Sequence, residues 1–252
     1  MKIEEFLESL PDGIVSGEDV NLSAKPLGEI FKLVGLGSND VFYHLGCGDE
    51  QGVLIAAREF NVKKAVGIDN NCQKIKNAAR LVDKDLPVTF LCKDVRDSDI
   101  SDATVVLFWF VEDEIIEPMM KKFESLRSGT RIVTIWGPLP ECLPHKAKFP
   151  YIINQIPFTR AANLQEQLLS VFGVKCIDFV TAWEFAERYT KSISGGQIRN
   201  DRFLTIIQTL MIWINARNLG VACGDEIPES IQTYTSIMHE HFDIDFGHLL
   251  QK

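Results

Sequence analysis

The chain has 252 residues, 46% of them hydrophobic and 24% charged, and its 26 basic and 35 acidic side chains leave a net charge of −9. This composition is typical of a folded protein with one sizeable hydrophobic core and a smaller one. Because contacts with phosphates need a basic surface, the acidic balance argues against DNA or RNA as the main partner. A basic protein matches this charge better.

The sequence contains no run of about eighteen uncharged apolar residues, the length that a membrane-spanning helix needs. Its first residues read Met-Lys-Ile-Glu-Glu and lack the basic-then-apolar order of a signal peptide. We therefore expect a cytoplasmic protein. The cysteines lie far apart, without a Cys-x-x-Cys pair or a histidine at zinc-ligand spacing, so we expect reduced, mostly buried thiols and no metal site. These cysteines are Cys47, Cys72, Cys92, Cys142, Cys176 and Cys223.

Helix-like and strand-like patterns follow one another along the first 136 residues. A short amphipathic helix is expected at residues 3–10, and Ser23 can cap a second helix from Lys25 or Pro26 to Val34. Apolar strands are expected at residues 40–45, 64–69, 87–92, 103–110 and 130–136, and helices at 52–60, 71–83 and 112–126. This alternation predicts an α/β fold with a mostly parallel sheet and crossover helices on both faces.

The pattern changes in the last third of the chain. Residues 151–158 form a last extended piece that can complete the sheet as an edge hairpin, where Pro157 is tolerated. Beyond it, apolar residues recur at helical spacing, and residues 203–214 are apolar on nearly every side. We expect a domain at residues 1–158 and an all-helical extension at 159–252, with that apolar helix at the centre of a bundle or at a homodimer or partner interface.

The stretch Val-Phe-Tyr-His-Leu-Gly-Cys-Gly-Asp-Glu at residues 41–50 carries the strongest functional signal. An apolar strand runs into a turn with Gly46 and Gly48, and a helix-like pattern begins at Val53. Glycines in such a turn let backbone N–H groups at a helix N-terminus approach a ligand closely. A second apolar strand ends in Asp69, whose carboxylate can accept both hydroxyls of a ribose. Together these features predict a nucleoside-binding βαβ unit.

Two other interpretations of this turn remain open. A dinucleotide site with the pattern Gly-x-Gly-x-x-Gly would place its third glycine at residue 51, which is Gln51, and Gly52 comes one position late. Asp49 and Glu50 would also repel a pyrophosphate, so this alternative is disfavoured. The other alternative is a tight turn in a doubly wound sheet that binds no ligand.

The order His-Leu-Gly-Cys-Gly resembles the Asp-x-Gly-x-Gly loop of class I S-adenosylmethionine-dependent methyltransferases. With residues 60–69, 93–96, 101–110 and 126–133, the stretch from about residue 20 to 158 looks like the archaeal protein lysine methyltransferases, relatives of the non-SET histone lysine methyltransferase. The resemblance implies a Rossmann-like class I methyltransferase fold, S-adenosylmethionine as cofactor and a protein lysine amine as methyl acceptor.

The same resemblance implies the roles of particular residues. The two loop glycines would cradle the methionine end of the cofactor, Asp69 would hold the ribose, and Asp94 with the Val95 backbone would read the adenine. The implied cofactor-binding residues are His44, Gly46, Cys47, Gly48, Glu50, Asp69, Asn70, Asp94 and Val95, and the implied catalytic residues beside the methyl group are Phe108, Trp109 and Phe110.

Aromatic faces can hold a lysine stem, lower the pKa of its amine by desolvation and attract a sulfonium. Because side chains alternate along a strand, Phe108 and Phe110 cannot share the face of Trp109. Core packing is the alternative role for all three residues.

Two residues depart from the family pattern. His44 stands where the family loop begins with aspartate, and Glu50 stands at the third glycine. Both change the charge near the methionine end of the cofactor, and a Cβ at residue 50 can be incompatible with the backbone angles of a glycine. The alternative function is therefore a catalytically weakened cofactor-binding scaffold or sensor.

Overall fold

The computed structural model describes residues 22–194 and 201–250. The helix expected at residues 3–10 lies outside this range. The described residues form two compact units, one that ends at Ala162 and one that begins at Asn163. This division falls close to the boundary expected after residue 158, and each unit is described separately below.

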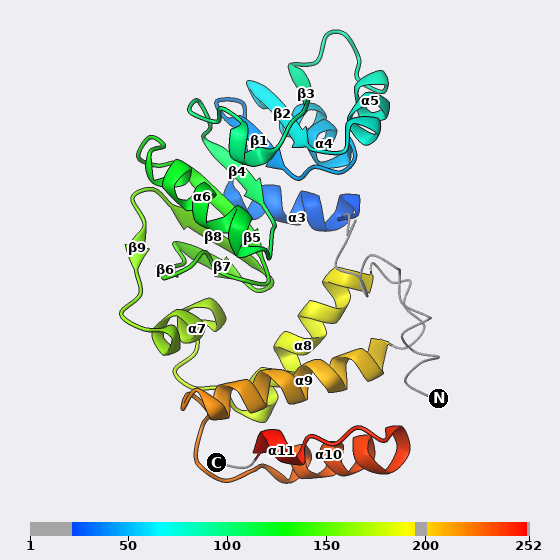
Figure 1. The fold of residues 1–252 in the computed structure, drawn as a ribbon, viewed down its shortest axis with the longest axis vertical. Helices are drawn as coiled ribbons and strands as arrows, with labels where there is room; N and C mark the ends of the chain where they lie inside the picture. The colour runs from blue at the N-terminus through cyan, green and yellow to red at the C-terminus, as the bar shows by residue number, and fades with distance from the viewer. Residues whose placement is uncertain (1–21, 195–200, 251–252) are drawn as a thin grey trace. The chain divides into compact units, whose positions relative to one another are not determined.

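The first unit is built on a seven-stranded sheet with strand order β3-β2-β1-β4-β5-β8-β7 (Figure 1). Its first five strands in this order pair in parallel, and β8 and β7 join the β5 side in antiparallel orientation. The sheet confirms the expected mostly parallel α/β fold. The strands are β1 (Val41–Leu45), β2 (Lys64–Asp69), β3 (Val88–Cys92), β4 (Val105–Phe108), β5 (Arg131–Ile135), β7 (Lys146–Lys148) and β8 (Tyr151–Gln155).

Helices cover both faces of the sheet. The apolar residues of α3 (Ala24–Val34) and α4 (Gln51–Glu59) share one core with Val105 and Leu107 of β4. Residues of α6 (Asp113–Glu124) share the other core with Val106 and Phe108 of the same strand. This alternation along β4 is what a central parallel strand buried on both faces requires.

The crossover between β2 and β3 is α5 (Cys72–Arg80), and a 3₁₀ turn, η1 (Val95–Asp97), follows β3. Ser23 occupies the N-cap position of α3, as expected, although its side chain makes no capping hydrogen bond.

Three details of the first unit differ from the sequence expectation. Residues 151–155 lie between β5 and β7, so that the outermost strand of the hairpin is β7, and Pro157 follows the end of β8. A separate two-stranded sheet pairs β6 (Cys142–Leu143) with β9 (Thr159–Arg160). The expected strand at residues 103–110 is shorter, because residues 109–112 leave the sheet after β4.

The second unit is helical, as expected. It contains α7 (Leu164–Phe172), α8 (Phe179–Ser194), α9 (Asp201–Asn218), α10 (Glu229–Phe242) and the short α11 (Gly247–Leu250). Its core gathers Leu210, Trp213 and Ile214 of α9 with Ile231 of α10, each at most 1% exposed. The apolar helix α9 therefore contributes to the core of this unit, although some of its apolar side chains, such as Ile207 and Met211, are only half-buried. None of the helices in the described ranges is long and apolar enough to cross a membrane.

The expectation of six reduced cysteines is wrong for four of them. Cys72 pairs with Cys92, with Cα atoms 4.9 Å apart, and Cys176 pairs with Cys223, with Cα atoms 5.1 Å apart. Cys47 and Cys142 are buried and form no disulfide. Sequence spacing could not reveal these pairs, because separations of 20 and 47 residues become bonding distances only through the tertiary fold.

Candidate functional site

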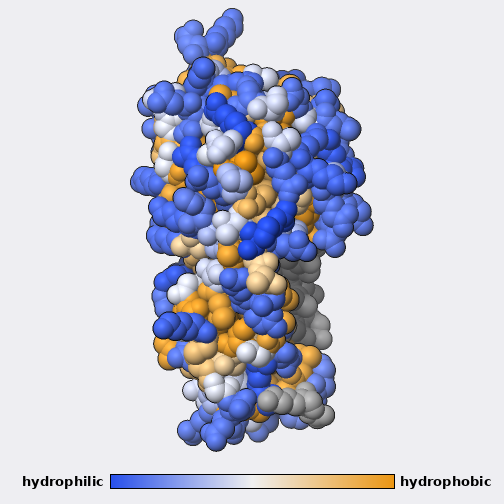
Figure 2. All heavy atoms as spheres, turned by 90° about the vertical axis from the view of Figure 1, so that its left-hand side faces the viewer, coloured by the Kyte–Doolittle hydropathy of each residue, from blue (hydrophilic) through white to orange (hydrophobic). Residues whose placement is uncertain are grey.

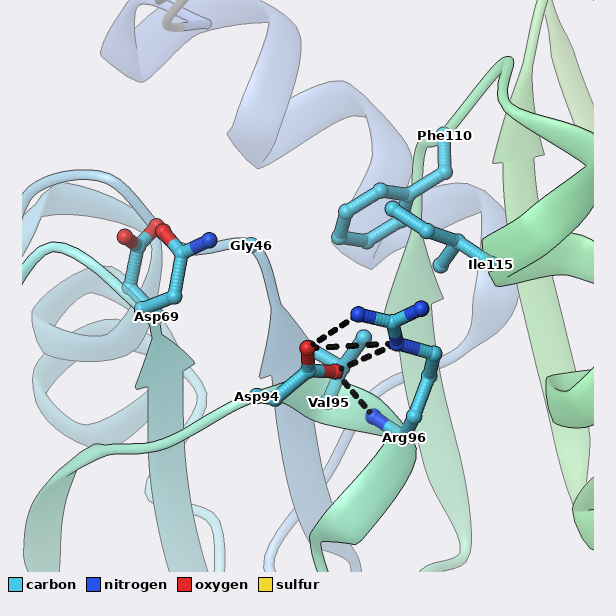
Figure 3. A pocket seen from close by; sticks show the side chains of 8 residues that line it. Gly46, Asp69, Asp94, Val95, Arg96, Phe110 and Ile115 are labelled. Atoms are coloured by element: carbon cyan, nitrogen blue, oxygen red, sulfur yellow. Dashed lines mark hydrogen bonds and ion pairs between the residues drawn. The ribbon is translucent and has the colours of Figure 1, made fainter.

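A pocket lies at the carboxyl edge of the parallel strands, where open α/β sheets bind their ligands (Figure 3). Its walls come from the turns after β1, β2 and β3, the residues after β4 and the first turn of α6. All but two of its lining residues are predicted site residues, and the two additions are Arg96 and Ile115. The lining consists of Gly46, Asp69, Asn70, Asp94, Val95, Arg96, Phe110 and Ile115.

The turn after β1 requires a glycine at residue 46 for two reasons. Its φ is +70°, a conformation that side chains disfavour, and a Cβ there would lie 2.7 Å from Cζ of Phe110. The N–H groups of Gly46 and Cys47 donate to the carbonyl oxygen of Ile68, at 2.8 and 3.1 Å. The turn is thereby bonded to the end of β2, and the Phe110 ring closes the pocket over the glycine.

Asp69 is the best-positioned acid of the pocket. Its Oδ2 accepts a 2.8 Å hydrogen bond from the Gly48 N–H, and its Oδ1 accepts one of the same length from the Asn71 N–H. These two bonds orient the carboxylate at the end of β2. Because an ionised carboxylate offers about four acceptor sites, two remain for the hydroxyls of a ribose.

Asp94 is held by Arg96, a residue that the sequence interpretation missed. Oδ1 of Asp94 accepts from the Arg96 N–H and Nε at 2.8 and 3.0 Å, and Oδ2 accepts from Nη2 at 2.6 Å. These hydrogen bonds lower the pKa of the Asp94 carboxyl to about 2, so it stays ionised. The signal in the sequence was the Asp-x-Arg spacing at a turn, which lets the guanidinium fold back. Figure 3 shows this guanidinium between Asp94 and the side chains of Phe110 and Ile115.

His44 lies outside the pocket, between β1 and α4. A Cβ on Gly52 would be 2.6 Å from its Nδ1, so the glycine lets the helix pack closely over the imidazole. Nδ1 is buried and has no hydrogen-bond partner among the described residues. Desolvation lowers the pKa of His44 to about 4, which leaves it neutral at physiological pH. His44 therefore brings no charge to the loop.

Glu50 carries no backbone strain. Its φ of −79° and ψ of −16° are ordinary right-handed angles, and it stands at the N-cap position of α4. It lines a different surface recess, together with Ala24, Leu54 and Arg58. The Cβ of Glu50 therefore does not distort the loop.

Cys47 points into the core, at 2% exposure, and burial raises the pKa of its thiol to about 12. It is neutral and does not line the pocket. Gly48, with φ of +59°, acts on the site through the hydrogen bond from its N–H to Asp69.

The predicted aromatic trio is split between the faces of the sheet. Phe108 is 2% exposed and packs against Phe110 and Phe123, with ring centroids 4.9 and 5.1 Å away. Trp109 packs with the opposite core and meets Trp136 edge to face at 4.6 Å. Only Phe110 lines the pocket. The alternation argument is thus confirmed, and the burial of Phe108 favours a packing role over contact with a substrate.

Comparison with known proteins found no family model that matches the chain. A protein-lysine N-methyltransferase from Saccharolobus islandicus is 34% identical over 116 residues, which are 44% of this chain and 70% of that protein. A carboxy-S-adenosyl-L-methionine synthase from Aliivibrio fischeri is 37% identical over 73 residues, only 27% of this chain and 30% of that protein.

Among solved structures, an RNA methyltransferase from Salinibacter ruber in complex with S-adenosyl-L-homocysteine superimposes with a TM-score of 0.51 at 26% identity. The match covers 57% of this chain and 99% of that one. Its extent agrees with the sheet-bearing unit and leaves much of the chain without a counterpart.

Proposed function

We propose, since the chain belongs to the class I S-adenosylmethionine-dependent methyltransferases, that it transfers a methyl group to the side-chain amine of a lysine in a protein. The observation that carries the proposal is the pocket in which Gly46, Asp69, Asp94 and Phe110 meet. Its polar groups suit an adenosine, and its aromatic wall suits the reacting end of the cofactor.

The residues present fit S-adenosylmethionine, whose sulfonium supplies the methyl group. At Gly46 the absence of a Cβ lets the Phe110 ring, which lines the pocket, lie close to the main chain. Asp69 has acceptor sites left for a ribose, and the ionised Asp94 can accept the amino group of an adenine. We assign these roles to the three residues. Asn70 and Val95 line the pocket beside them.

The acceptor side of the site is acidic. Glu112, Asp113 and Glu114 are exposed and come after Phe110 and Val111 in the chain. They lie at the start of α6, with Glu112 at its N-cap position. They attract a protonated lysine side chain to the entrance. The Phe110 ring then removes the amine from water, which lowers its pKa and favours the unprotonated nucleophile that methyl transfer needs. Holding the lysine amine beside the pocket also brings it close to the methyl group, which further accelerates the transfer.

RNA is the competing acceptor, because the structural relative is an RNA methyltransferase. The net charge of −9 and the acids beside Phe110 disfavour phosphate groups near this pocket. The relative with 34% identity is a protein-lysine N-methyltransferase, which adds support for a lysine acceptor.

A catalytically weakened scaffold is the less favoured alternative. It depends on His44 and Glu50, yet the imidazole is neutral and has a buried Nδ1, and Glu50 has ordinary backbone angles. Neither substitution closes the pocket. Neither residue lines the pocket, because His44 packs against Gly52 of α4 and Glu50 lines a different recess.

We further propose that the helical unit forms a homodimer or binds a partner protein. Hydrophobic side chains gather on the face of this unit that Figure 2 displays. Leu164 of α7 and Val180 of α8 are 56% and 69% exposed, and Ile207 and Met211 of α9 are half-buried. Apolar surface of this kind commonly marks association.

The lysine assignment is tested by labelled methyl transfer to a lysine-rich histone protein. Label should enter the protein, and prior acetylation of its lysines should prevent this. Total RNA serves as the competing acceptor in a parallel reaction. Label in RNA with none in the histone protein would contradict the proposal, and amino-acid analysis of the labelled protein must identify methyl-lysine.

A further inference from the structure

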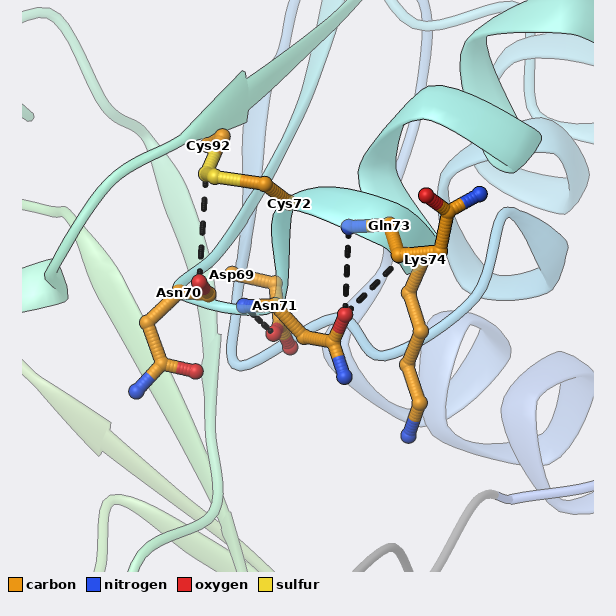
Figure 4. The surroundings of a disulfide bond; sticks show 7 residues. All are labelled: Asp69, Asn70, Asn71, Cys72, Gln73, Lys74 and Cys92. Atoms are coloured by element: carbon orange, nitrogen blue, oxygen red, sulfur yellow. Dashed lines mark hydrogen bonds between the residues drawn. A yellow bond between two sulfur atoms is a disulfide. The ribbon is translucent and has the colours of Figure 1, made fainter.

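The disulfide between Cys72 and Cys92 lies at the rim of the cofactor pocket (Figure 4). Cys92 is the last residue of β3 and pairs in register with Asp69, the last residue of β2. Cys72 is the first residue of α5, three positions after Asp69. The bond therefore ties together the two chain segments that leave β2 and β3.

Those two segments carry five of the eight pocket residues: Asp69, Asn70, Asp94, Val95 and Arg96. The disulfide is the covalent link between them, and it lies two positions from a pocket residue in each segment. Any change in this bond acts on both walls of the adenosine side of the pocket.

Residues next to the two cysteines are hydrogen-bonded to Asp69. The Asn71 N–H donates to Oδ1 of Asp69 at 2.8 Å, and the Asn71 side chain accepts from the Gln73 and Lys74 N–H groups at the start of α5. On the other segment, the Lys93 N–H donates to the carbonyl oxygen of Asp69 at 3.0 Å. Residues next to both cysteines thus help to hold Asp69, the residue assigned to the ribose.

Both sulfur-bearing residues are exposed, as are their neighbours Asn71, Gln73 and Lys93. A thiolate attacks a disulfide sulfur directly, so its access decides whether the bond exchanges. Cys47 and Cys142, which form no disulfide, are buried by comparison. Exposure makes the Cys72–Cys92 bond open to exchange with reductants in solution.

We propose that Cys72 and Cys92 form a thiol–disulfide modification site that sets the affinity of the pocket for S-adenosylmethionine, an inference that rests on the proposed function through its cofactor. The co-reactant is a dithiol reductant. One of its thiolates attacks a cysteine sulfur, the Cys72–Cys92 bond breaks, and a mixed disulfide forms. The second thiol of the reductant resolves it, so that two electrons and two protons pass to the cysteines and the reductant leaves as a disulfide.

The oxidised form binds the cofactor more tightly. In this form the covalent bond holds the two pocket segments together before the ligand arrives, whereas in the reduced form binding must order them. Binding by a pre-organised site avoids that entropic cost. We expect the dissociation constant for S-adenosylmethionine to rise roughly threefold to tenfold on reduction.

Calorimetric titration of the full chain with S-adenosylmethionine, in the presence and absence of a phosphine reductant, tests this inference. Alkylation and mass spectrometry establish the state of each cysteine in the same samples. Cys72→Ser and Cys92→Ser should each bind at the reduced wild-type level in both conditions. The matched control is Cys176→Ser, which removes the disulfide of the helical unit and should keep the response to reductant.

Equal dissociation constants in the two states, with alkylation showing that the bond has opened, would overturn the thiol–disulfide site and leave the cofactor assignment intact. The same holds if mass spectrometry finds both thiols free after treatment with oxidised glutathione. Loss of the response in Cys176→Ser would also overturn it. No binding in either state would instead refute the cofactor assignment, and this inference with it. A thermal melt of the reduced wild type confirms that the protein stays folded.

Discussion

The two units of this chain place their polar groups in different ways. In the unit that ends at Ala162, strands buried on both faces finish in polar turns, and Asp69 and Asp94 meet at one sheet edge. In the unit that begins at Asn163, helices bury apolar and aromatic side chains such as Trp213 against one another. A parallel sheet thus determines where a binding site lies, because the carboxyl ends of its strands meet at one edge. A helical bundle determines only which side chains are buried. The predictions below separate binding at the sheet edge from packing in the bundle.

Gly46→Val should produce the largest loss of cofactor binding. Valine is strained at a φ of +70°, and its Cβ would lie 2.7 Å from Cζ of Phe110. Backbone strain costs about 1–3 kcal/mol of stability. Because the Cβ fits only if the Phe110 ring moves, and this ring lines the pocket, we expect affinity to fall by roughly 100-fold or more. Calorimetry measures the change.

Gly129→Ala is the matched control for Gly46→Val. Its φ is +87°, and an added Cβ would meet no atom within 4 Å. We expect a lower melting temperature with unchanged affinity. If this variant lost binding as severely as Gly46→Val, the effect at residue 46 would be general destabilisation.

Asp69→Ala should weaken S-adenosylmethionine binding by about one to two orders of magnitude, because a charged hydrogen bond to the ribose is worth roughly 1.5–3 kcal/mol. Asp69→Asn, which keeps one acceptor oxygen, should lose less. An unchanged dissociation constant for the alanine variant in calorimetry would remove Asp69 from the site.

Ile207→Glu tests the role of the helical unit. Ile207 is half-buried on α9, and a charge there should dissociate a homodimer into 28.4 kDa chains while leaving cofactor affinity unchanged. Arg202→Glu, at an exposed position of the same helix, is the control. Light scattering that finds the wild type already at the mass of one chain at tens of micromolar would rule out a stable dimer. A collapse of the melting temperature in Ile207→Glu would show packing within the unit instead.

Arg96→Met should reduce affinity only several-fold at neutral pH, but it should change the pH dependence. Arg96 holds the pKa of the Asp94 carboxyl at about 2, and without it this pKa should return toward about 3.9. A depressed carboxyl pKa favours the ionised form at all pH values above it. Wild-type affinity should therefore stay level between about pH 6 and 4, and the variant should lose affinity as pH falls through about 4. Identical pH profiles would argue against this coupling.

Glu50→Gly should have the smallest effect, less than about threefold on affinity. Glu50 has ordinary backbone angles and lines a recess other than the pocket. A large gain in affinity from this change would revive the interpretation of a weakened binding protein, and a loss of roughly 1–3 kcal/mol would place the carboxylate against the cofactor ammonium.

The features that the sequence predicts correctly depend on residues close together in the chain. The strand that ends at Asp69 and the turn at Gly46 follow from apolar runs and glycines within a few residues, and the structure has both where the pattern places them. The order of strand and helix likewise predicts the parallel sheet. Such patterns depend on neighbours along the chain, which a single sequence displays.

The features that escaped prediction depend on contacts between distant residues. The Cys72–Cys92 bond requires the register of β2 against β3, and the position of Arg96 depends on how its side chain folds over Asp94. The backbone angles of Glu50 depend on where α4 begins. His44 looked like a change of charge at the loop, but its environment makes it neutral through desolvation. None of these can be deduced from composition or periodicity.

The most direct test of the account is a calorimetric titration of the wild-type chain with S-adenosylmethionine, repeated with Gly46→Val and Gly129→Ala. The account predicts binding of one cofactor per chain with a dissociation constant between about 1 μM and 1 mM, lost in the first variant and retained in the second. Absence of binding by the folded wild type, or equal binding by Gly46→Val and the wild type, would contradict it.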